Sequence, residues 1–164
     1  VEERTPAAQR FILEHGLNEN LEGDIKGVGI ILQGGLHNTL ARRLNTMGLG
    51  DNFGGSRIPL LVLNVVHPLV PDQITQFCAD KRDVLVLEEG NPEYIEHQVN
   101  VILRKADLGT RIHGKGVVPH SGEYTAAVHE KLNPITSTPV GAAGERETAK
   151  PKAAAKPKGK KTSK

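Results

Sequence analysis

The stretch DVLVLEEGNPEYIEHQVNVILRKA (Asp83–Ala106) joins a short apolar run to a longer segment with helical periodicity. Every residue of Asp83–Leu87 after the first is a large aliphatic residue, which is typical of a strand buried on both faces. Ile95, Val99 and Ile102 then recur at the spacing of one helical face. A buried strand followed directly by an amphipathic helix is the repeating unit of a parallel α/β sheet, so this stretch predicts that fold class.

The same alternation extends along most of the chain. We expect strands at residues 28–32, 58–66, 83–87 and 110–114, and helices at residues 5–15, 36–47, 71–81, 92–106 and 122–132. Repeated strand–helix alternation implies right-handed crossovers. The prediction is therefore a three-layer α/β domain, with a mainly parallel sheet of four to five strands and helices on both faces.

The first helix of the predicted domain carries start and stop signals at its two ends. Thr5 is expected to be the N-cap and Pro6 the first helical residue, because the missing N–H of proline costs nothing there. Phe11 and Ile12 are expected near the apolar face of this helix, and Gly16 follows its end.

Glu88 and Glu89 follow the strand of the opening stretch and raise the question of paired acid/base catalysis. Neighbouring residues on an extended chain point to opposite faces, so the two carboxylates are not expected to share a proton or a metal. Asn91 suits an N-cap and Pro92 the first helical position, which explains the remaining polarity as a helix start. We therefore predict no catalytic residue in this stretch, with one of the two glutamates facing a cleft.

Small and polar residues also follow the other strands of the predicted sheet. In open α/β sheets the carboxyl ends of the strands form the edge that faces ligands. The glycines after the strand at 28–32 can either hold an anion on backbone N–H groups or form a tight turn, and neither reading is excluded. The candidate cleft or interface at this edge consists of Gln33, Gly34, Gly35, Asn38, Asn64, Glu88, Glu89 and Gly90.

The net charge of +2 conceals two parts of opposite sign. Residues 1–132 carry 13 Lys and Arg against 17 Asp and Glu, whereas residues 133–164 carry 8 against 2. The second part is rich in Pro, Ala, Gly and Lys and has few large apolar residues, so we predict a disordered tail or linker after a domain at 1–132. Such a tail can contact nucleic acid or acidic partners, but it is more often a solvated extension, so nucleic acid is not the expected partner.

The number of cysteines and the length of the apolar runs exclude further classes of protein. Cys78 is the single cysteine, which excludes an internal disulfide and a cysteine-based zinc or iron–sulfur site, and suits the cytoplasm. The seven histidines follow no zinc pattern, so no metal site is predicted. No apolar run approaches ~18 residues, so no membrane association is expected. The chain begins with Val1 rather than Met, and three interpretations stay open: a piece of a longer protein, a split subunit or a stand-alone protein.

Several long stretches resemble one family of enzymes. GIILQGGLHNTLARRL (29–44), LNVVHPLVP (63–71), VLVLEEGNPEYIE (84–96) and HGKGVVPHSGEYT (113–125) resemble the α subunit of indolepyruvate:ferredoxin oxidoreductases, thiamine-diphosphate-dependent enzymes that act on 2-oxoacids. The resemblance covers about residues 6–132 and falls on the middle, transketolase C-terminal-like domain of that subunit. His67, Gly116 and His120 depart from the residues that the family pattern has there.

This resemblance implies a division of labour within a larger enzyme. The complete enzyme would oxidatively decarboxylate arylpyruvates to acyl-CoA and reduce ferredoxin, using thiamine diphosphate, Mg²⁺ and iron–sulfur clusters. The cofactor motifs of the family lie in other domains, and no Gly-Asp-Gly metal motif occurs in this chain. The resemblance therefore implies a structural or interface domain that binds no cofactor alone and has other domains or subunits of the oxidoreductase as partners. Two alternatives stay open, a stand-alone module that binds through its Lys-rich tail and a small-molecule site at the strand ends.

Overall fold

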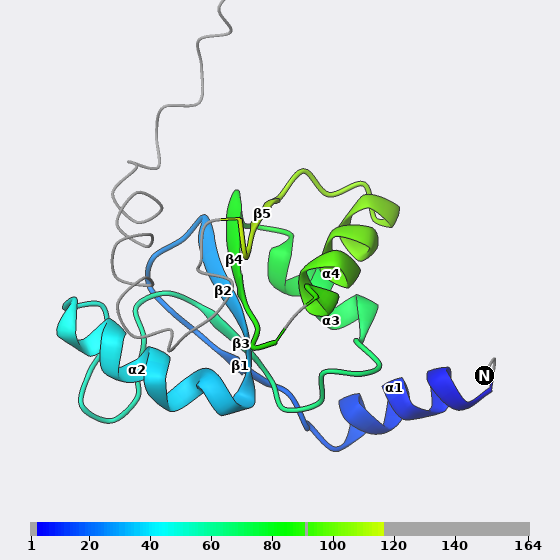
Figure 1. Cartoon of the computed structure of the whole chain (residues 1–164), viewed down its shortest axis with the longest axis horizontal. Coiled ribbons are helices and arrows are strands. Elements are labelled where there is room, and N and C mark those ends of the chain that lie inside the picture. The colour runs from blue at the N-terminus through cyan, green and yellow to red at the C-terminus, as the bar shows by residue number, and fades with distance from the viewer. Residues whose placement is uncertain (1–2, 91, 117–164) are drawn as a thin grey trace, which may run out of the picture.

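A computed structural model of the chain describes residues 3–90 and 92–116, and Figure 1 shows their arrangement. The elements follow one another as α1 (Arg4–Glu14), β1 (Glu19–Leu21), β2 (Val28–Gln33), the 3-10 helix η1 (Gly34–Leu36), α2 (His37–Thr46), β3 (Leu60–Leu63), α3 (Pro71–Cys78), β4 (Asp83–Leu87), α4 (Tyr94–Lys105) and β5 (Arg111–His113). The expected closing helix at 122–132 and the tail at 133–164 lie outside the described residues, as does Asn91.

The five strands of the described residues form one sheet in the order β1-β3-β2-β4-β5. The pairs β3–β2, β2–β4 and β4–β5 are parallel, and β1 pairs antiparallel with β3 at one edge. The mainly parallel sheet predicted from the sequence is confirmed. The polar, three-residue β1 was not predicted, because Glu19 and Asn20 carry no strand signal and become a strand only by pairing with β3.

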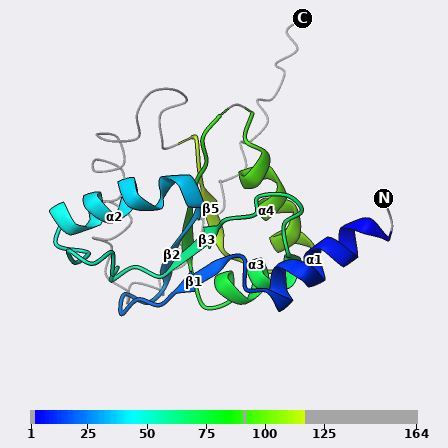
Figure 2. The same ribbon diagram turned by 90° about the horizontal axis from the view of Figure 1, so that it is seen from below.

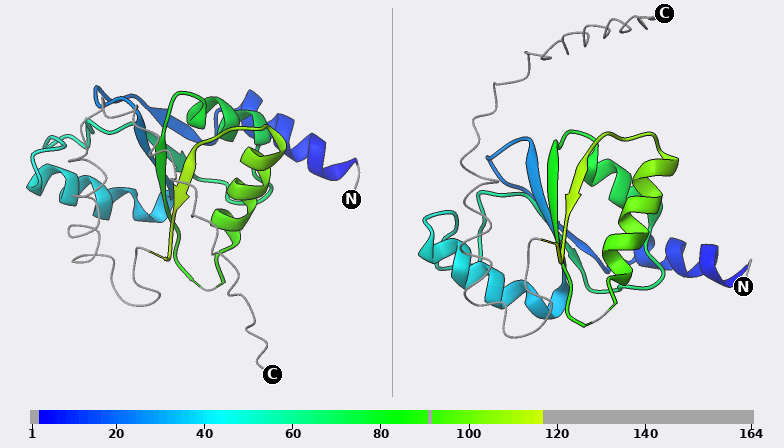
Figure 3. Two further views of the ribbon diagram at one scale, coloured as in Figure 1. Left: turned by 90° about the horizontal axis from the view of Figure 1, so that it is seen from above. Right: turned by 45° about the horizontal axis from the view of Figure 1, so that its top comes forward.

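Helices cover both faces of this sheet, as predicted. Figures 1 and 3 show α2 on one side of the sheet and the α3–α4 pair on the other. Each face has its own apolar cluster, because alternate residues of the central strands point to opposite sides. Ile30, Leu32 and Leu85 pack with Leu40 and Leu44 of α2. On the other face the cluster comprises Ile31, Leu61, Val84 and Val86 with Ile74, Phe77 and Cys78 of α3 and Ile95, Val99 and Leu103 of α4.

The first helix, α1, projects away from the body of the domain (Figure 2). It begins at Arg4 with Glu3 as N-cap, so the expected cap at Thr5 is wrong by two residues. Ile12 is buried, but Phe11 is 53% exposed and stacks on the His15 ring at 3.9 Å between centroids. Phe11 is therefore not on the buried face, because the helix touches the domain along one narrow side.

Two further boundaries differ from the predictions. The strand expected at 58–66 is only Leu60–Leu63, because its neighbour β2 ends at Gln33 opposite Leu63. The helix expected from Pro92 starts at Tyr94, so Pro92 precedes it instead of opening it. On that helix Leu103 occupies the buried position that Ile102 was expected to take, and Ile102 is only partly buried.

A buried carboxylate joins β4 to β5 at the amino end of the sheet. Asp83 is 5% exposed and accepts hydrogen bonds from Arg82 (Nε, 2.5 Å), Arg111 (Nε, 2.9 Å) and His113 (Nε2, 3.0 Å). Burial raises the pKa of this carboxyl, but the hydrogen bonds from His113, Arg82 and Arg111 outweigh burial and lower the pKa to about 2. These hydrogen bonds connect β4 to β5 at the end of the sheet opposite to the candidate cleft, so we assign the cluster a structural role.

Candidate functional site

The candidate cleft lies where the chain reverses its direction across the sheet. From β2 the chain moves outward to β3, then crosses back to β4 and continues to β5 on the other side. The carboxyl ends of β2 and β4 are therefore adjacent strand ends from which successive connections diverge. In open α/β sheets ligands bind at such a switch point. Leu32 pairs with Leu87, so Gln33 and Glu88 leave the sheet at the same level.

Gln33 bridges the two strand ends directly. Its side-chain oxygen Oε1 accepts a hydrogen bond of 2.9 Å from the backbone N–H of Glu89. This contact holds the segment after β4 against the end of β2. Gly90 follows with φ of +92°, a conformation that residues with a Cβ rarely adopt, and the glycine lets the chain turn away toward α4.

Glu88 and Glu89 have different surroundings. Glu88 is 4% exposed, and its carboxylate accepts hydrogen bonds from the backbone N–H groups of Ile95 (2.9 Å) and Glu96 (3.2 Å). These N–H groups belong to the first turn of α4, where no intrahelical acceptor exists. Glu88 therefore caps α4 from the strand end, while Glu89 is exposed. The two carboxylates do not form a pair.

Of the remaining predicted site residues, Gly34, Gly35 and Asn64 follow the ends of strands, whereas Asn38 lies on α2. Gly34 is packed so closely on Asn64 that a Cβ would lie 2.2 Å from the Asn64 Oδ1 atom. The Asn64 amide donates to the backbone oxygen of Leu17 (3.0 Å) and to Oε1 of Glu19 (2.9 Å), so it holds the β1 side of the sheet. Gly35 has open space around it.

Asn38 lies apart from the strand-end cleft. It is an exposed residue of α2 and lines a separate polar hollow between that helix and the loop at 51–54. Of the predicted residues, the structure thus brings together Gln33, Glu88, Glu89 and Gly90 around one cleft.

This cleft has a volume of about 570 Å³ and includes residues that the sequence analysis missed. Val66 and His67 come from the loop after β3, and Tyr94 and Gln98 from α4. The spacing of Tyr94 and Gln98 by four residues on a helix that starts at this edge is the signal that could have found them. The full lining is Gln33, Val66, His67, Glu88, Glu89, Gly90, Pro92, Tyr94, Ile95 and Gln98.

The charge of the cleft determines which groups it can accept. Among the residues that the structure describes, its lining contains two glutamates and neither Lys nor Arg. The N-terminal N–H groups of Ile95 and Glu96, which would attract an anion, already bind the Glu88 carboxylate. The cleft is therefore suited to neutral or cationic hydrogen-bonding groups and not to a phosphate. Within residues 3–90 and 92–116, no group of three or more His, Cys, Asp or Glu side chains could hold a metal ion.

The fold and the strand-end cleft place the chain in the class of open, mainly parallel α/β domains, and comparisons with known proteins agree. A solved structure described as "Split gene transketolase, inactive beta4 tetramer" matches with a TM-score of 0.50 and 15% sequence identity, over 71% of this chain and 37% of that one. The match supports a transketolase-like fold.

The sequence of this chain is also similar to that of a curated protein. "Indolepyruvate oxidoreductase subunit IorA" of Methanothermobacter thermautotrophicus is 28% identical over an alignment of 120 residues that covers 71% of this chain and 18% of that protein. The resemblance to this family predicted from the sequence is confirmed. The chain spans about a fifth of the length of this relative. No protein-family model matches the chain. Among the described residues, no helix is long and apolar enough to cross a membrane.

Proposed function

We propose that this chain is the transketolase C-terminal-like domain of a thiamine-diphosphate-dependent indolepyruvate:ferredoxin oxidoreductase, and that it acts as an interface domain. The observation that carries the proposal is the 120-residue similarity to an indolepyruvate oxidoreductase subunit, on a fold shared with a transketolase. The complete enzyme would oxidise arylpyruvates to acyl-CoA with ferredoxin as the electron acceptor. The chain would contribute a surface and no chemistry of its own.

The composition of the cleft supports this passive role. A diphosphate cofactor needs cationic or N–H donors and a metal bound by oxygen ligands. The cleft has two glutamates instead, and its helix N-terminus is already capped by Glu88. The strand-end cleft therefore does not fit thiamine diphosphate, and the cofactor would bind to the neighbouring domains of the enzyme.

A binding experiment with two arms tests the proposal. Titration calorimetry of the full chain with thiamine diphosphate and Mg²⁺ should give no binding heat. The pyrimidine- and pyrophosphate-binding domains of the oxidoreductase from the same organism, expressed separately, should bind the chain in a pull-down and in calorimetry. Tight cofactor binding by the chain alone, or failure of both domains to bind it, would refute the proposal.

A pair of charge reversals locates the contact surface. If the strand-end cleft faces a neighbouring domain, Glu89→Lys should weaken that binding by about 10-fold, because a reversed charge at an interface meets a surface complementary to the original one. Glu14→Lys is the matched control, since Glu14 is also an exposed glutamate but lies at the end of α1. If Glu89→Lys and Glu14→Lys bind the neighbouring domain with equal affinity, the contact lies elsewhere on the domain.

A further inference from the structure

A polar hollow, called the α2 hollow below, lies between α2 and the loop at 51–54, away from the strand-end cleft. Its volume of about 550 Å³ lies within the range of small-molecule sites. The helical wall consists mainly of His37, Asn38, Arg42 and Asn45. The last three follow one another at intervals of four and three residues, which places them on one face of the helix. The α2 hollow therefore offers amides, a guanidinium group and an imidazole from a single rigid element.

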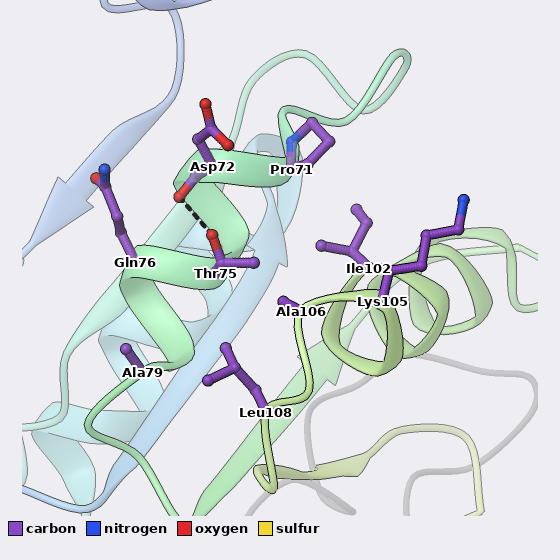
Figure 4. A pocket seen from close by; sticks show the side chains of 9 residues that line it. All are labelled: Pro71, Asp72, Thr75, Gln76, Ala79, Ile102, Lys105, Ala106 and Leu108. Atoms are coloured by element: carbon purple, nitrogen blue, oxygen red, sulfur yellow. Dashed lines mark hydrogen bonds between the residues drawn. The ribbon is translucent and has the colours of Figure 1, made fainter.

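The hollow between α3 and the C-terminal end of α4 has a different character. Figure 4 shows Ile102 and Leu108 between the two helices, with the charged ends of Asp72 and Lys105 directed outward. Apolar walls of this kind do not select one occupant, whereas polar groups at fixed places select a ligand by its chemistry. The α2 hollow is therefore the better candidate for a specific site.

The loop that forms the second wall of the α2 hollow is held by its own hydrogen bonds. Oδ1 of Asp51 accepts hydrogen bonds of 2.8 Å from the backbone N–H groups of Phe53 and Gly55. Nδ2 of Asn45 donates to Oδ1 of Asn52 at 2.7 Å, which connects the loop to the last turn of α2. A wall that is already ordered loses little conformational freedom when a ligand binds to it.

Two opposite charges border the α2 hollow without neutralising each other. Arg42 lies on the helical wall and Asp51 on the loop wall. Within residues 3–90 and 92–116, neither side chain makes an ion pair. A phosphate would meet the carboxylate of Asp51, and a simple amine would meet the guanidinium of Arg42, as a like charge. A ligand with one anionic and one cationic group satisfies both walls.

Two further observations narrow the class of ligand. His37 borders the hollow, and its Nε2 atom is buried and has no hydrogen-bond partner among the described residues. Such an atom is normally satisfied by a water molecule, an ion or a ligand. The ring of Phe53 also borders the hollow and is 97% exposed, so its face is open to an apolar or aromatic group.

We propose that the α2 hollow binds a free α-amino acid with an aromatic side chain. The carboxylate of the ligand binds Arg42, its ammonium group faces Asp51, and its ring packs on Phe53. An α-amino acid carries both charges on one carbon atom, so it fits between two walls of opposite charge. Because the hollow is open to water, we expect a dissociation constant of about 1 mM. This inference rests on the surface of the chain alone and not on the proposed enzyme function.

Equilibrium dialysis of the full chain with L-tryptophan tests the proposal without any other protein. The chain contains no Trp, so the fluorescence of the ligand reports its concentration directly. Tryptamine lacks the carboxylate and indole-3-propionate lacks the ammonium group, so each should bind about 10-fold more weakly than L-tryptophan. Absence of saturable binding of L-tryptophan, or equal binding of the three compounds, would overturn the proposal.

Substitutions on the two walls test which residue meets which charge. Arg42→Gln should weaken the binding of L-tryptophan by about 10-fold and leave that of tryptamine unchanged. Asp51→Asn keeps the side-chain oxygen that the loop uses but removes the charge, so it should weaken L-tryptophan and spare indole-3-propionate. Phe53→Ala should weaken all three compounds. Arg43→Gln is the matched control, because Arg43 is the next residue of α2 and does not line the hollow. If Arg42→Gln acts like Arg43→Gln, or weakens L-tryptophan and tryptamine equally, the proposal is wrong.

Discussion

Glu88 determines how α4 begins, although it lies outside that helix in the sequence. Its carboxylate binds the N–H groups of Ile95 and Glu96, and the N-cap residue Glu93 makes no side-chain cap. Glu88→Ala leaves two donors of the first turn without this acceptor, so it should lower the free energy of unfolding by about 1–3 kcal/mol. Urea unfolding measures this difference.

Glu89→Ala is the matched control for that change. Glu89 is exposed, and its contact with Gln33 uses its backbone N–H, which the alanine keeps. Its effect should stay within about 0.5 kcal/mol. Equal effects of the two substitutions would contradict the capping role of Glu88.

Asp83 predicts how stability depends on acid. Its pKa is lowered from 3.8 to about 2 because the hydrogen bonds from His113, Arg82 and Arg111 outweigh the effect of burial. A carboxyl with a lower pKa in the folded state stabilises the fold above its unfolded pKa, and this contribution disappears as the pH falls from about 4 through about 2. The contribution at neutral pH is of order 2 kcal/mol.

Asp83→Asn removes that titration. Unfolding free energies measured between neutral pH and pH near 2 should therefore fall less steeply for Asp83→Asn than for the unaltered chain. Asp107→Asn is the control, because Asp107 is exposed and has a positive φ of 53°, which asparagine tolerates. If the unaltered chain, Asp83→Asn and Asp107→Asn all lose the same free energy of unfolding as the pH falls, the pKa of Asp83 does not differ between the folded and unfolded states, which would contradict this prediction.

At the scale of the element, α3 holds the one thiol of the chain inside the domain. Cys78 has no exposed surface, and burial raises its pKa to about 12. Reaction with a thiol reagent then requires opening of α3 from the sheet, so labelling should be roughly 1,000-fold slower in the folded chain than in denaturant.

A chain that combines Cys78→Ala with Phe53→Cys provides the control for this labelling. Its thiol stands on an exposed loop and should react as fast in the folded as in the unfolded chain. Rapid labelling of native Cys78 would mean that α3 is not packed as described.

The elements also show which features a sequence can predict. The central strands β2 and β4 were predicted because a strand buried on both faces is apolar almost throughout, and the helix expected at 36–47 was predicted because burial of one helical face leaves a periodic pattern. The edge strand β1 was missed because pairing with β3, and not its own composition, makes it a strand. The start of α4 was misplaced because its cap comes from Glu88, a residue in the preceding strand end.

The residues of the candidate cleft also include some that a sequence can predict and some that it cannot. Glu88 and Glu89 differ in burial, as the alternation of an extended chain predicts, but the expectation that only one of them faces a cleft is wrong, because both line it. The part played by Val66, His67, Tyr94 and Gln98 depends on how the loop after β3 and the start of α4 meet above the sheet. Asn38 was misplaced because proximity to the glycines in sequence does not place a helical side chain at the strand ends.

At the scale of the whole molecule, the two apolar clusters define what the fold requires. Among the residues that the structure describes, the buried apolar side chains lie between Ile12 and Leu103, and those of the two clusters lie from Val28 onward. Residues 133–164 contain few large apolar side chains, so their deletion should change the free energy of unfolding by less than about 0.5 kcal/mol. The shortened chain should also keep its affinity for the oxidoreductase domains, because that contact is proposed on the described surface.

The same deletion separates the interface domain from the alternative in which the Lys-rich segment binds nucleic acid. Residues 133–164 carry 8 Lys and Arg against 2 Glu, whereas residues 1–132 are net acidic. A nucleic-acid arm would give binding to duplex DNA or RNA that falls steeply with salt and vanishes in the shortened chain. We expect no such binding by either chain in fluorescence anisotropy at physiological salt. If the full chain binds nucleic acid in a salt-dependent way and the shortened chain does not, residues 133–164 are the binding segment. The folded domain is not expected to supply this binding, because the two glutamates of the strand-end cleft repel phosphate.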